Sequence, residues 1–123
     1  MLLPATDIYV LQARILKTLA SPRRLEIVHL LGERGPLEVR RIAAHFGTTQ
    51  PAISQHLGAM RSAGLVEAIR AGRDVRYQLT DPELVGTCAS MREILVRRMA
   101  KMGHLAAEYA GHEAETARVT ASA

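Results

Sequence analysis

Short, uncharged polar side chains are concentrated in one stretch of the sequence, TTQPAISQHLGAMRSAGLV, residues 48–66. Apolar residues recur there at helical spacing, with Ile53, Leu57 and Met60 on one side of the expected helix. The polar residues off that side are Thr48, Thr49, Gln50, Ser54, Gln55 and His56. A face that is merely solvated more often carries Lys and Glu, whereas these side chains donate and accept hydrogen bonds at close range. We interpret this face as one that a binding partner touches closely.

Arginine carries most of the positive charge of the chain. There are 16 Lys and Arg residues against 12 Asp and Glu, a formal net charge of +4, and Lys17 and Lys101 are the only lysines. Because the guanidinium fork binds phosphate oxygens bidentately, this excess is compatible with phosphate recognition. A GC-rich coding bias explains the preference for Arg over Lys equally well, but it does not explain where the arginines lie.

Length and composition favour one small helical domain. The chain has 123 residues, of which 48% are hydrophobic and only 3% aromatic, so the core must consist of aliphatic residues and Met. Such a core favours packed helices over a β-sandwich. We expect a single domain over residues 1–110 and a disordered tail over 111–123, where Ala, Thr and Glu dominate.

Several classes of protein are excluded by what the sequence lacks. A lone cysteine cannot form an intramolecular disulfide framework, and neither a leader peptide nor an apolar run of about 20 residues is present. We therefore expect a cytoplasmic protein with no membrane partner. A glycine-rich phosphate loop, a nucleophile elbow and a catalytic carboxylate pair are also missing, so we predict that the chain is not an enzyme.

Four helices are predicted before residue 65. Apolar residues at steps of three and four mark the first helix over 5–20, and Ser21-Pro22 begins the second, which we expect to bury Leu25 among others. The third helix is predicted over 37–46 and the fourth from the N-cap Thr49.

A β-hairpin and a long helix complete the predicted order. From Val66 the apolar period changes to two on either side of a turn at residues 71–74, and Arg70, Arg73 and Arg76 make the tip of this hairpin basic. Thr80-Asp81-Pro82 then caps a final helix. Its apolar stripe consists of Leu84, Cys88, Met91, Leu95, Met99 and Met102.

This order of elements predicts a mainly α fold with a small β-hairpin, the winged helix-turn-helix. In that fold the second helix of the turn motif enters the DNA major groove, and the hairpin follows the backbone or the minor groove. Gln50 and Ser54 could then pair with base edges, while Thr48 and Thr49 donate to phosphates. The alternatives are a helical corner beside a solvated turn, or a protein-interaction module, which would expose apolar anchors.

Three segments carry a resemblance to a known family. LASPRRLEIVHLL, RRIAAHFGTTQPAISQHLGAMRSAGLV and RAGRDVRYQL resemble successive signatures of the ArsR/SmtB-type transcriptional repressors, over roughly residues 10–100. The resemblance implies a homodimer, formed by the first and last helices, that binds an inverted-repeat operator in double-stranded DNA and is released by an effector.

The resemblance also assigns roles to individual residues. It implies that Gln50, Ser54 and Gln55 read bases, and that Arg73 lies at the wing tip. The residues implied on or near phosphates are Arg40, Arg41, Thr49, His56 and Arg61, although His56 fits a structural hydrogen bond equally well. The expected dimer interface comprises Ile8, Leu11, Ile15, Leu84, Cys88, Met91, Leu95 and Met99, whose stripes have no other obvious cover in so small a core.

The two metal sites best known in this family are missing. A thiolate site would need Cys-x-Cys near residues 37–41, where this chain has LEVRR. A zinc site on the last helix could use Asp81, but Glu83, Ile94 and Arg97 occupy its other positions.

A different metal site can be formed by His104, Glu108 and His112, which follow one another at steps of four. On a continuous helix they share a side, where imidazole and carboxylate can chelate Ni(II), Zn(II) or Co(II). Gly103 and Gly111 weaken that helix, and a polar helical end often has no ligand at all. The remaining alternative is a regulator that binds no metal and is controlled by a small molecule or a partner protein.

Overall fold

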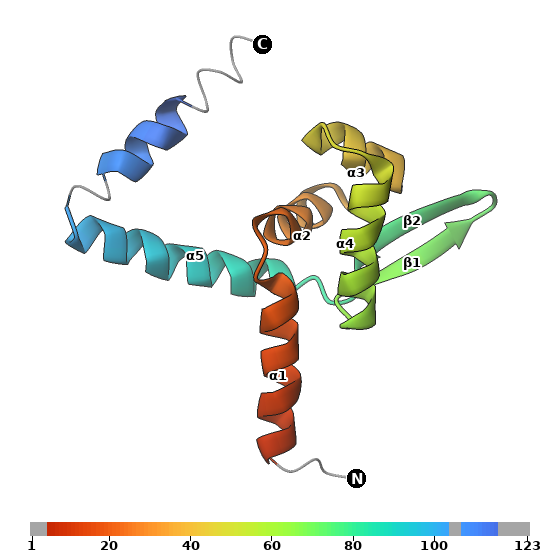
Figure 1. Cartoon of the computed structure of the whole chain (residues 1–123), viewed down its shortest axis with the longest axis horizontal. Helices are drawn as coiled ribbons and strands as arrows, with labels where there is room; N and C mark the ends of the chain where they lie inside the picture. The colour runs from red at the N-terminus through yellow and green to blue at the C-terminus, as the bar shows by residue number, and fades with distance from the viewer. Residues whose placement is uncertain (1–4, 104–106, 116–123) are drawn as a thin grey trace. The chain divides into compact units, whose positions relative to one another are not determined.

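The computed structural model describes residues 5–103 and 107–115 (Figure 1). Its elements follow in the order α1 (Ala5–Leu19), α2 (Pro22–Arg34), α3 (Val39–Phe46), α4 (Gln50–Ser62), β1 (Val66–Ala71), β2 (Asp74–Leu79) and α5 (Leu84–Lys101). This is the predicted helical fold with one antiparallel hairpin. By its internal contacts the chain divides into two units, Met1–Val85 and Gly86–Ala123. None of the described helices is both long and apolar enough to cross a membrane.

Local sequence signals set the ends of α2. Ser21 is its N-cap, and the Ser21 hydroxyl accepts a hydrogen bond from the Arg24 amide at 3.4 Å. Pro22 occupies the first turn, where its missing N–H leaves no hydrogen bond unmade. Gly35 ends the helix with φ +76°, in the left-handed region that favours glycine.

The core of the first unit is aliphatic, as the composition predicts. Its buried members are Leu19, Ile27, Val28, Leu30, Leu31, Ile42, Ala43, Ile53, Leu57, Met60, Leu65, Val66 and Leu79. Leu25 was expected among them, but its side chain is 44% exposed. At 3.6 residues per turn, Leu25 lies on the opposite side of α2 from Ile27 and Leu31, so the prediction for this residue was wrong.

α3 begins at Val39 rather than at the predicted Leu37. Leu37 forms an isolated β-bridge with Tyr77 on β2, in which the two N–H···O distances are 3.0 and 2.8 Å. Because these bonds use the amide and the carbonyl of Leu37, this residue extends along β2 instead of starting the helix. The bridge places the beginning of α3 against the hairpin.

The hairpin has the predicted position and turn. Val66 pairs with Leu79 at its base and Ala71 with Asp74 at its end, which leaves Gly72 and Arg73 as the loop. Gly72 has φ +64°, a conformation that two-residue hairpin loops require. The loop projects away from the helices of this unit (Figure 1).

The described part of the second unit is mainly helical. Asp81 Oδ1 accepts a hydrogen bond from the Glu83 amide at 3.0 Å just before α5 begins. Residues 107–115 are also helical, so 111–115, predicted as part of a disordered tail, belong to a helix instead. Ala and Glu favour helix there, and the Tyr109 hydroxyl donates to Glu113 Oε1 at 2.7 Å, one turn later. Residues 116–123 lie outside the described part of the chain.

Candidate nucleic-acid interface

A tight turn joins α3 to α4. Gly47 adopts the left-handed conformation, with φ +63° and ψ +36°, and the Thr48 amide donates to the Ala43 carbonyl at 3.0 Å. Thr49 then caps α4, because its hydroxyl accepts a hydrogen bond from the Ala52 amide at 3.3 Å. These bonds fix where the polar face of α4 begins. They also confirm Thr49 as the N-cap.

α4 has two sharply different sides. Ile53, Leu57 and Met60 are buried against the rest of the unit, as the sequence predicts. The predicted base-reading residues, Gln50, Ser54 and Gln55, are all exposed. None of these three side chains hydrogen bonds to another residue in the described ranges 5–103 and 107–115, so their donors and acceptors are available to a ligand.

The N-terminal end of α4 suits an anion. The Thr49 side chain is exposed, and because its oxygen serves the cap as an acceptor, its O–H remains free to donate. Thr48 is half-buried beside it. The positive end of the helix dipole adds to the attraction for a phosphate at this position.

The arginines predicted near phosphates differ in how free they are. Arg40 Nε donates to Glu38 Oε2 at 2.9 Å, and this hydrogen bond lowers the pKa of Glu38 below its usual range. Arg41 and Arg61 are exposed, and neither forms an ion pair with any other described residue. Arg41 lies with Arg76 in a shallow cleft of about 190 Å³ between the start of α3 and β2. Arg41 and Arg61 are therefore better placed to bind a phosphate than Arg40.

The three hairpin arginines are exposed but do not share one face. Arg70 is paired with Val75, on the face that carries the buried Val66 and Leu79 at the base of the hairpin. Arg76 is paired with Ile69 on the opposite face, since side chains alternate along a strand. Arg73 lies in the loop between them. The wing therefore presents positive charge on both faces and at its tip.

His56 has the structural hydrogen bond that the sequence left as an alternative. Its ring is half-buried, and Nδ1 accepts a hydrogen bond from Arg24 Nε at 3.1 Å. Burial lowers the pKa of His56, and the positive charges of Arg24 and Arg23 lower it further. The neutral ring thus carries its proton on Nε2. Sequence reasoning gave Arg24 no role, because its partner lies 32 residues away and no local pattern links them.

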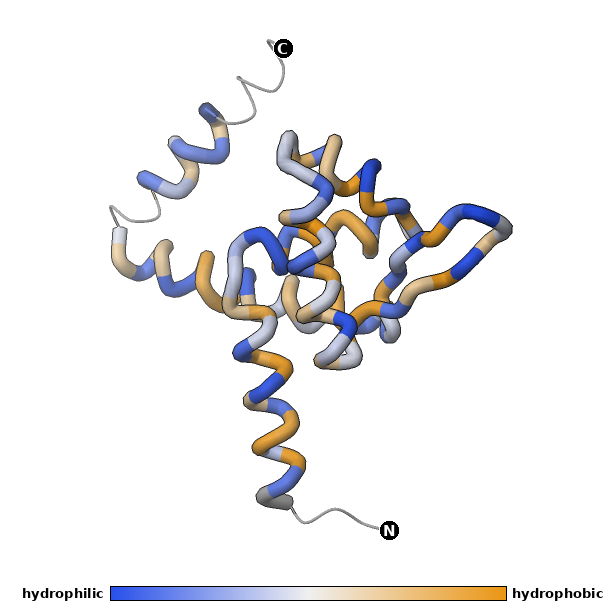
Figure 2. The backbone as a smooth tube through the Cα atoms, turned by 45° about the vertical axis from the view of Figure 1, so that its right-hand side comes forward, coloured by the Kyte–Doolittle hydropathy of each residue, from blue (hydrophilic) through white to orange (hydrophobic). Residues whose placement is uncertain are grey.

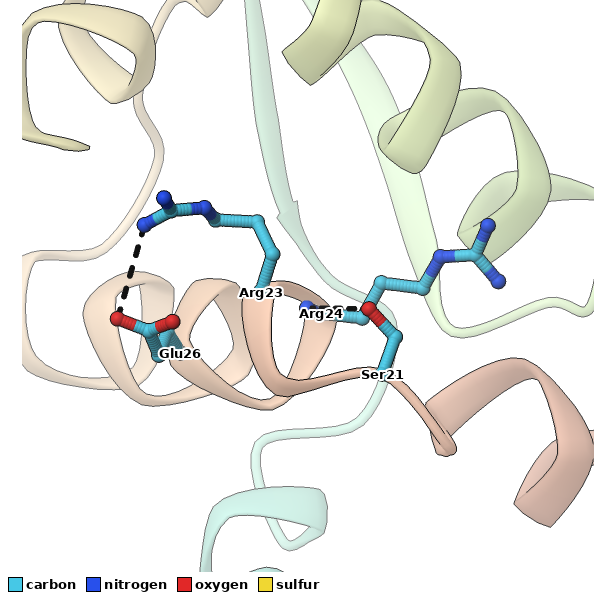
Figure 3. Close-up of polar contacts among 4 residues, drawn as sticks. All are labelled: Ser21, Arg23, Arg24 and Glu26. Atoms are coloured by element: carbon cyan, nitrogen blue, oxygen red, sulfur yellow. Dashed lines mark hydrogen bonds and ion pairs between the residues drawn. The ribbon is translucent and has the colours of Figure 1, made fainter. Parts of the chain in front are cut away.

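Arg23 and Arg24 leave the start of α2 on opposite sides (Figure 3). Arg23 lies 3.6 Å from Glu26 and stacks over the Phe46 ring, with 4.5 Å from its guanidinium carbon to the ring centroid. His45 contacts the same ring edge to face. These contacts join the first turn of α2 to the last turn of α3, next to the helix-turn-helix.

Both terminal helices contain apolar residues, coloured orange in Figure 2, and several of these residues are exposed. On α1, Ile8 is 49% and Leu11 42% exposed, and on α5, Met91 is 58% and Leu95 57% exposed. The other predicted interface residues, Ile15, Leu84, Cys88 and Met99, are half-buried, and burial raises the pKa of the Cys88 thiol. Sequence reasoning missed further exposed apolar residues, which are Tyr9, Val10, Leu16, Ile94 and Val96. They flank the predicted stripes, so broader stripes would have included them.

The candidate metal ligands are only partly described. His104 lies outside the described residues, whereas Glu108 and His112 are exposed on the helix at 107–115. Within the described ranges, no three His, Cys, Asp or Glu side chains lie close enough together to hold a metal ion.

Comparisons with known proteins agree with this geometry. Residues 21–68 match the sequence model of the bacterial regulatory proteins of the arsR family. The chain is 36% identical over 90 residues to the uncharacterized HTH-type transcriptional regulator Rv0081 of Mycobacterium tuberculosis, a match that covers 73% of this chain and 79% of the relative.

Solved structures share the fold. The crystal structure of Rv0081 matches with a TM-score of 0.69 at 34% identity, over 77% of this chain and 95% of that one. The homodimeric winged helix-turn-helix DNA-binding domain of Mb0332 from Mycobacterium bovis, a possible ArsR-family transcriptional regulator, gives 0.67 at 32% identity, over 73% and 82%. The transcriptional repressor PagR of Bacillus anthracis gives 0.64 at 30% identity, over 70% and 98%.

Proposed function

The chain belongs to the ArsR family of bacterial regulatory proteins and is a DNA-binding transcription regulator, not an enzyme; from this premise we propose that it represses transcription as a homodimer bound to an inverted-repeat operator. The observation that carries the proposal is the division of α4 into a buried apolar side and an exposed side whose amide and hydroxyl groups have no partner among the described residues. The protein acts in the cytoplasm, where bacterial DNA lies.

Base recognition is assigned to the first turns of α4. A glutamine amide can donate and accept at once, which matches the paired acceptor and donor that adenine presents in the major groove. Gln50 and Gln55 supply two such amides, and Ser54 supplies a hydroxyl that can pair with several bases. An interaction module for proteins would instead need large apolar anchors on this side, and the exposed residues here are polar apart from Pro51 and Gly58.

Phosphate contacts are assigned to the groups around α4. Thr49, Arg41 and Arg61 lie on the helix-turn-helix, and Arg73 lies in the hairpin loop. Such contacts fix the position of the protein on the duplex and carry no sequence information directly. They should make the affinity for any DNA fall as the salt concentration rises.

The homodimer is proposed from the exposed apolar residues of α1 and α5 and from the homodimeric relative Mb0332. Two-fold symmetry would present two copies of α4 to successive major grooves, about 34 Å apart. An inverted repeat is the DNA sequence with the same symmetry. We therefore expect half-sites separated by one helical turn.

Gln50→Ala and Arg73→Ala separate base reading from phosphate binding. We expect Gln50→Ala to weaken binding to the operator by about 1–3 kcal/mol while leaving random DNA unaffected, because only the base contact is lost. Arg73→Ala should weaken binding to both DNAs and reduce the salt dependence. The operator is first selected by the wild-type protein from a randomised DNA pool, and affinities are then measured by fluorescence anisotropy at several salt concentrations.

Two outcomes would contradict the proposed function. One is that the wild-type protein enriches no sequence from the pool. The other is that Gln50→Ala changes neither affinity, which would show that this side of α4 does not read bases.

The effector is proposed to be a divalent metal bound through the last helical segment. Glu108 and His112 share one side of the helix at 107–115, because they are four residues apart. We expect saturating Ni(II), Zn(II) or Co(II), added to protein prepared without metal, to lower its operator affinity about tenfold. His112→Ala should abolish this effect. His29→Ala is the matched control, since His29 is an exposed histidine on α2 that interacts with Glu33. Operator affinity that does not change with any of the three metals would favour a small molecule or a partner protein as effector.

A further inference from the structure

Arg24 connects three helices through one side chain. Its backbone amide is held by the Ser21 cap at the start of α2. Its guanidinium donates from Nη1 to the Thr18 carbonyl near the C-terminal end of α1 at 3.0 Å, and from Nε to His56 Nδ1 on α4 at 3.1 Å. Both α1 and α2 also contact α4 directly. Arg24 therefore links α1 to α4, the helix with the free polar side, through hydrogen bonds.

We propose that Arg24 is a positioning residue for DNA recognition, which fixes the rotation of α4 relative to α1 through its hydrogen bond to His56. The inference deepens the proposed function and rests on it. Arg24 itself touches no base, and its effect on the DNA passes through α4.

The buried side of α4 fixes this rotation only coarsely. Ile53, Leu57 and Met60 hold the helix against the core, but the hydrophobic effect that drives their burial is non-directional and tolerates small rotations of the helix. A hydrogen bond has a preferred angle as well as a distance. His56 directly follows Ser54 and Gln55, so anchoring its ring sets the direction in which these two side chains leave the helix.

The link requires a guanidinium. Its planar fork offers Nε and Nη1 in fixed directions, and Arg24 uses Nε for His56 and Nη1 for the Thr18 carbonyl. Lysine keeps the positive charge but carries a single ammonium on a flexible stem, so it cannot hold both acceptors in the same geometry. Arg24→Lys therefore removes the pair of hydrogen bonds to His56 and Thr18 and leaves the net charge unchanged.

The link also requires a neutral His56. Nδ1 accepts the hydrogen bond from Arg24 only while it has a free lone pair, and protonation would place a second cation against the guanidinium. The charged groups that act on the ring are Arg24 and Arg23 of α2, and no carboxylate from a described residue of α1 or α4 opposes them. Since the pKa of His56 is lowered, the link is present at neutral pH and is lost as the pH falls through that pKa, below the usual value of about 6.5.

The test compares four variants on the selected operator and on random DNA of the same length. Anisotropy is measured between about pH 5 and pH 8, at a temperature where circular dichroism shows every variant folded. We expect Arg24→Lys and His56→Leu to lower operator affinity about tenfold, the size expected for a charged hydrogen bond, and to leave random DNA within about twofold. His56→Asn, whose amide oxygen takes the place of Nδ1, should keep most of the operator affinity.

The pH dependence of operator affinity distinguishes the positioning role from a general contribution of Arg24 and His56 to stability. In the wild type we expect operator affinity to fall in acid, although added positive charge favours binding to any DNA. His56→Asn should lose this fall, because an amide oxygen does not titrate in this range. His45→Gln, a change at an exposed histidine of α3, should keep it.

The outcomes separate the inference from the proposed function. A wild-type protein that does not distinguish operator from random DNA contradicts the proposed function. A wild-type protein that does, with Arg24→Lys equal to it or weakened equally on both DNAs, overturns the positioning role alone. If Arg24→Lys does not fold, the comparison of His56→Asn with His56→Leu decides, and equal affinities for the operator overturn the inference.

Discussion

Leu57→Ala is expected to lower the free energy of unfolding by about 2–5 kcal/mol. The Leu57 side chain is 1% exposed and lies between the fully buried Ile53 and Met60 on the inner side of α4. Removing its branched end loses the transfer free energy of the missing carbons and leaves a cavity, which the neighbouring side chains fill only in part. Urea denaturation at a fixed protein concentration measures the effect, since unfolding of a dimer depends on concentration.

Ser54→Ala is the matched control on the other side of the same helix. Ser54 is exposed and makes no hydrogen bond within the described residues, so its loss should change the unfolding free energy by less than about 0.5 kcal/mol. Operator discrimination should nevertheless fall. If both variants cost the same stability, or if Leu57→Ala costs less than about 1 kcal/mol, then α4 does not present these two sides as described.

The start and the buried side of α4 could be predicted from the sequence because their signals are local. The period of Ile53, Leu57 and Met60 identified the buried side of α4, and Thr49 identified its first residue. Each signal acts within one or two helical turns. The sequence alone therefore also placed Gln50, Ser54 and Gln55 correctly on the exposed side, whereas His56, predicted on the same side, is half-buried.

Contacts between distant residues escaped prediction. The sequence around Leu37 is compatible with the start of a helix. Leu37 is extended instead because it forms a β-bridge with Tyr77, which lies far along the chain. The link between Arg24 and His56 is of the same kind, because a spacing of 32 residues has no period that a single sequence reveals. Such bonds depend on how the helices pack, and this packing is decided by the whole core.

The wing falls between these two cases. The alternation of Val75, Tyr77 and Leu79 predicted a strand, and it already implies that Arg70 and Arg76 lie on opposite faces once the register is known. Without the register, the three arginines looked like one basic tip. The turn at Gly72 supplies that register.

Leu11→Asp is expected to convert the proposed dimer into a monomer and to weaken operator binding about a hundredfold or more. Leu11 is 42% exposed within a single chain, so a charge there should not disturb the core of the monomer. In the dimer the same carboxylate would be buried against apolar residues, where an unpaired charge is strongly unfavourable. Sedimentation equilibrium measures the oligomeric state, and anisotropy on full and half operators measures the loss.

Gln12→Asp places the same charge on the neighbouring residue of α1, which is exposed and polar already, and it should leave both the dimer and the operator affinity intact. The affinities for the full operator and for a single half-site are then compared. Two linked recognition helices gain affinity because the second one binds at a high effective concentration. The Leu11→Asp monomer should therefore bind the full operator no better than the half-site. A monomer that still preferred the full operator would show that α1 does not join the two recognition helices, and that the exposed residues of α5 alone hold the dimer together on DNA.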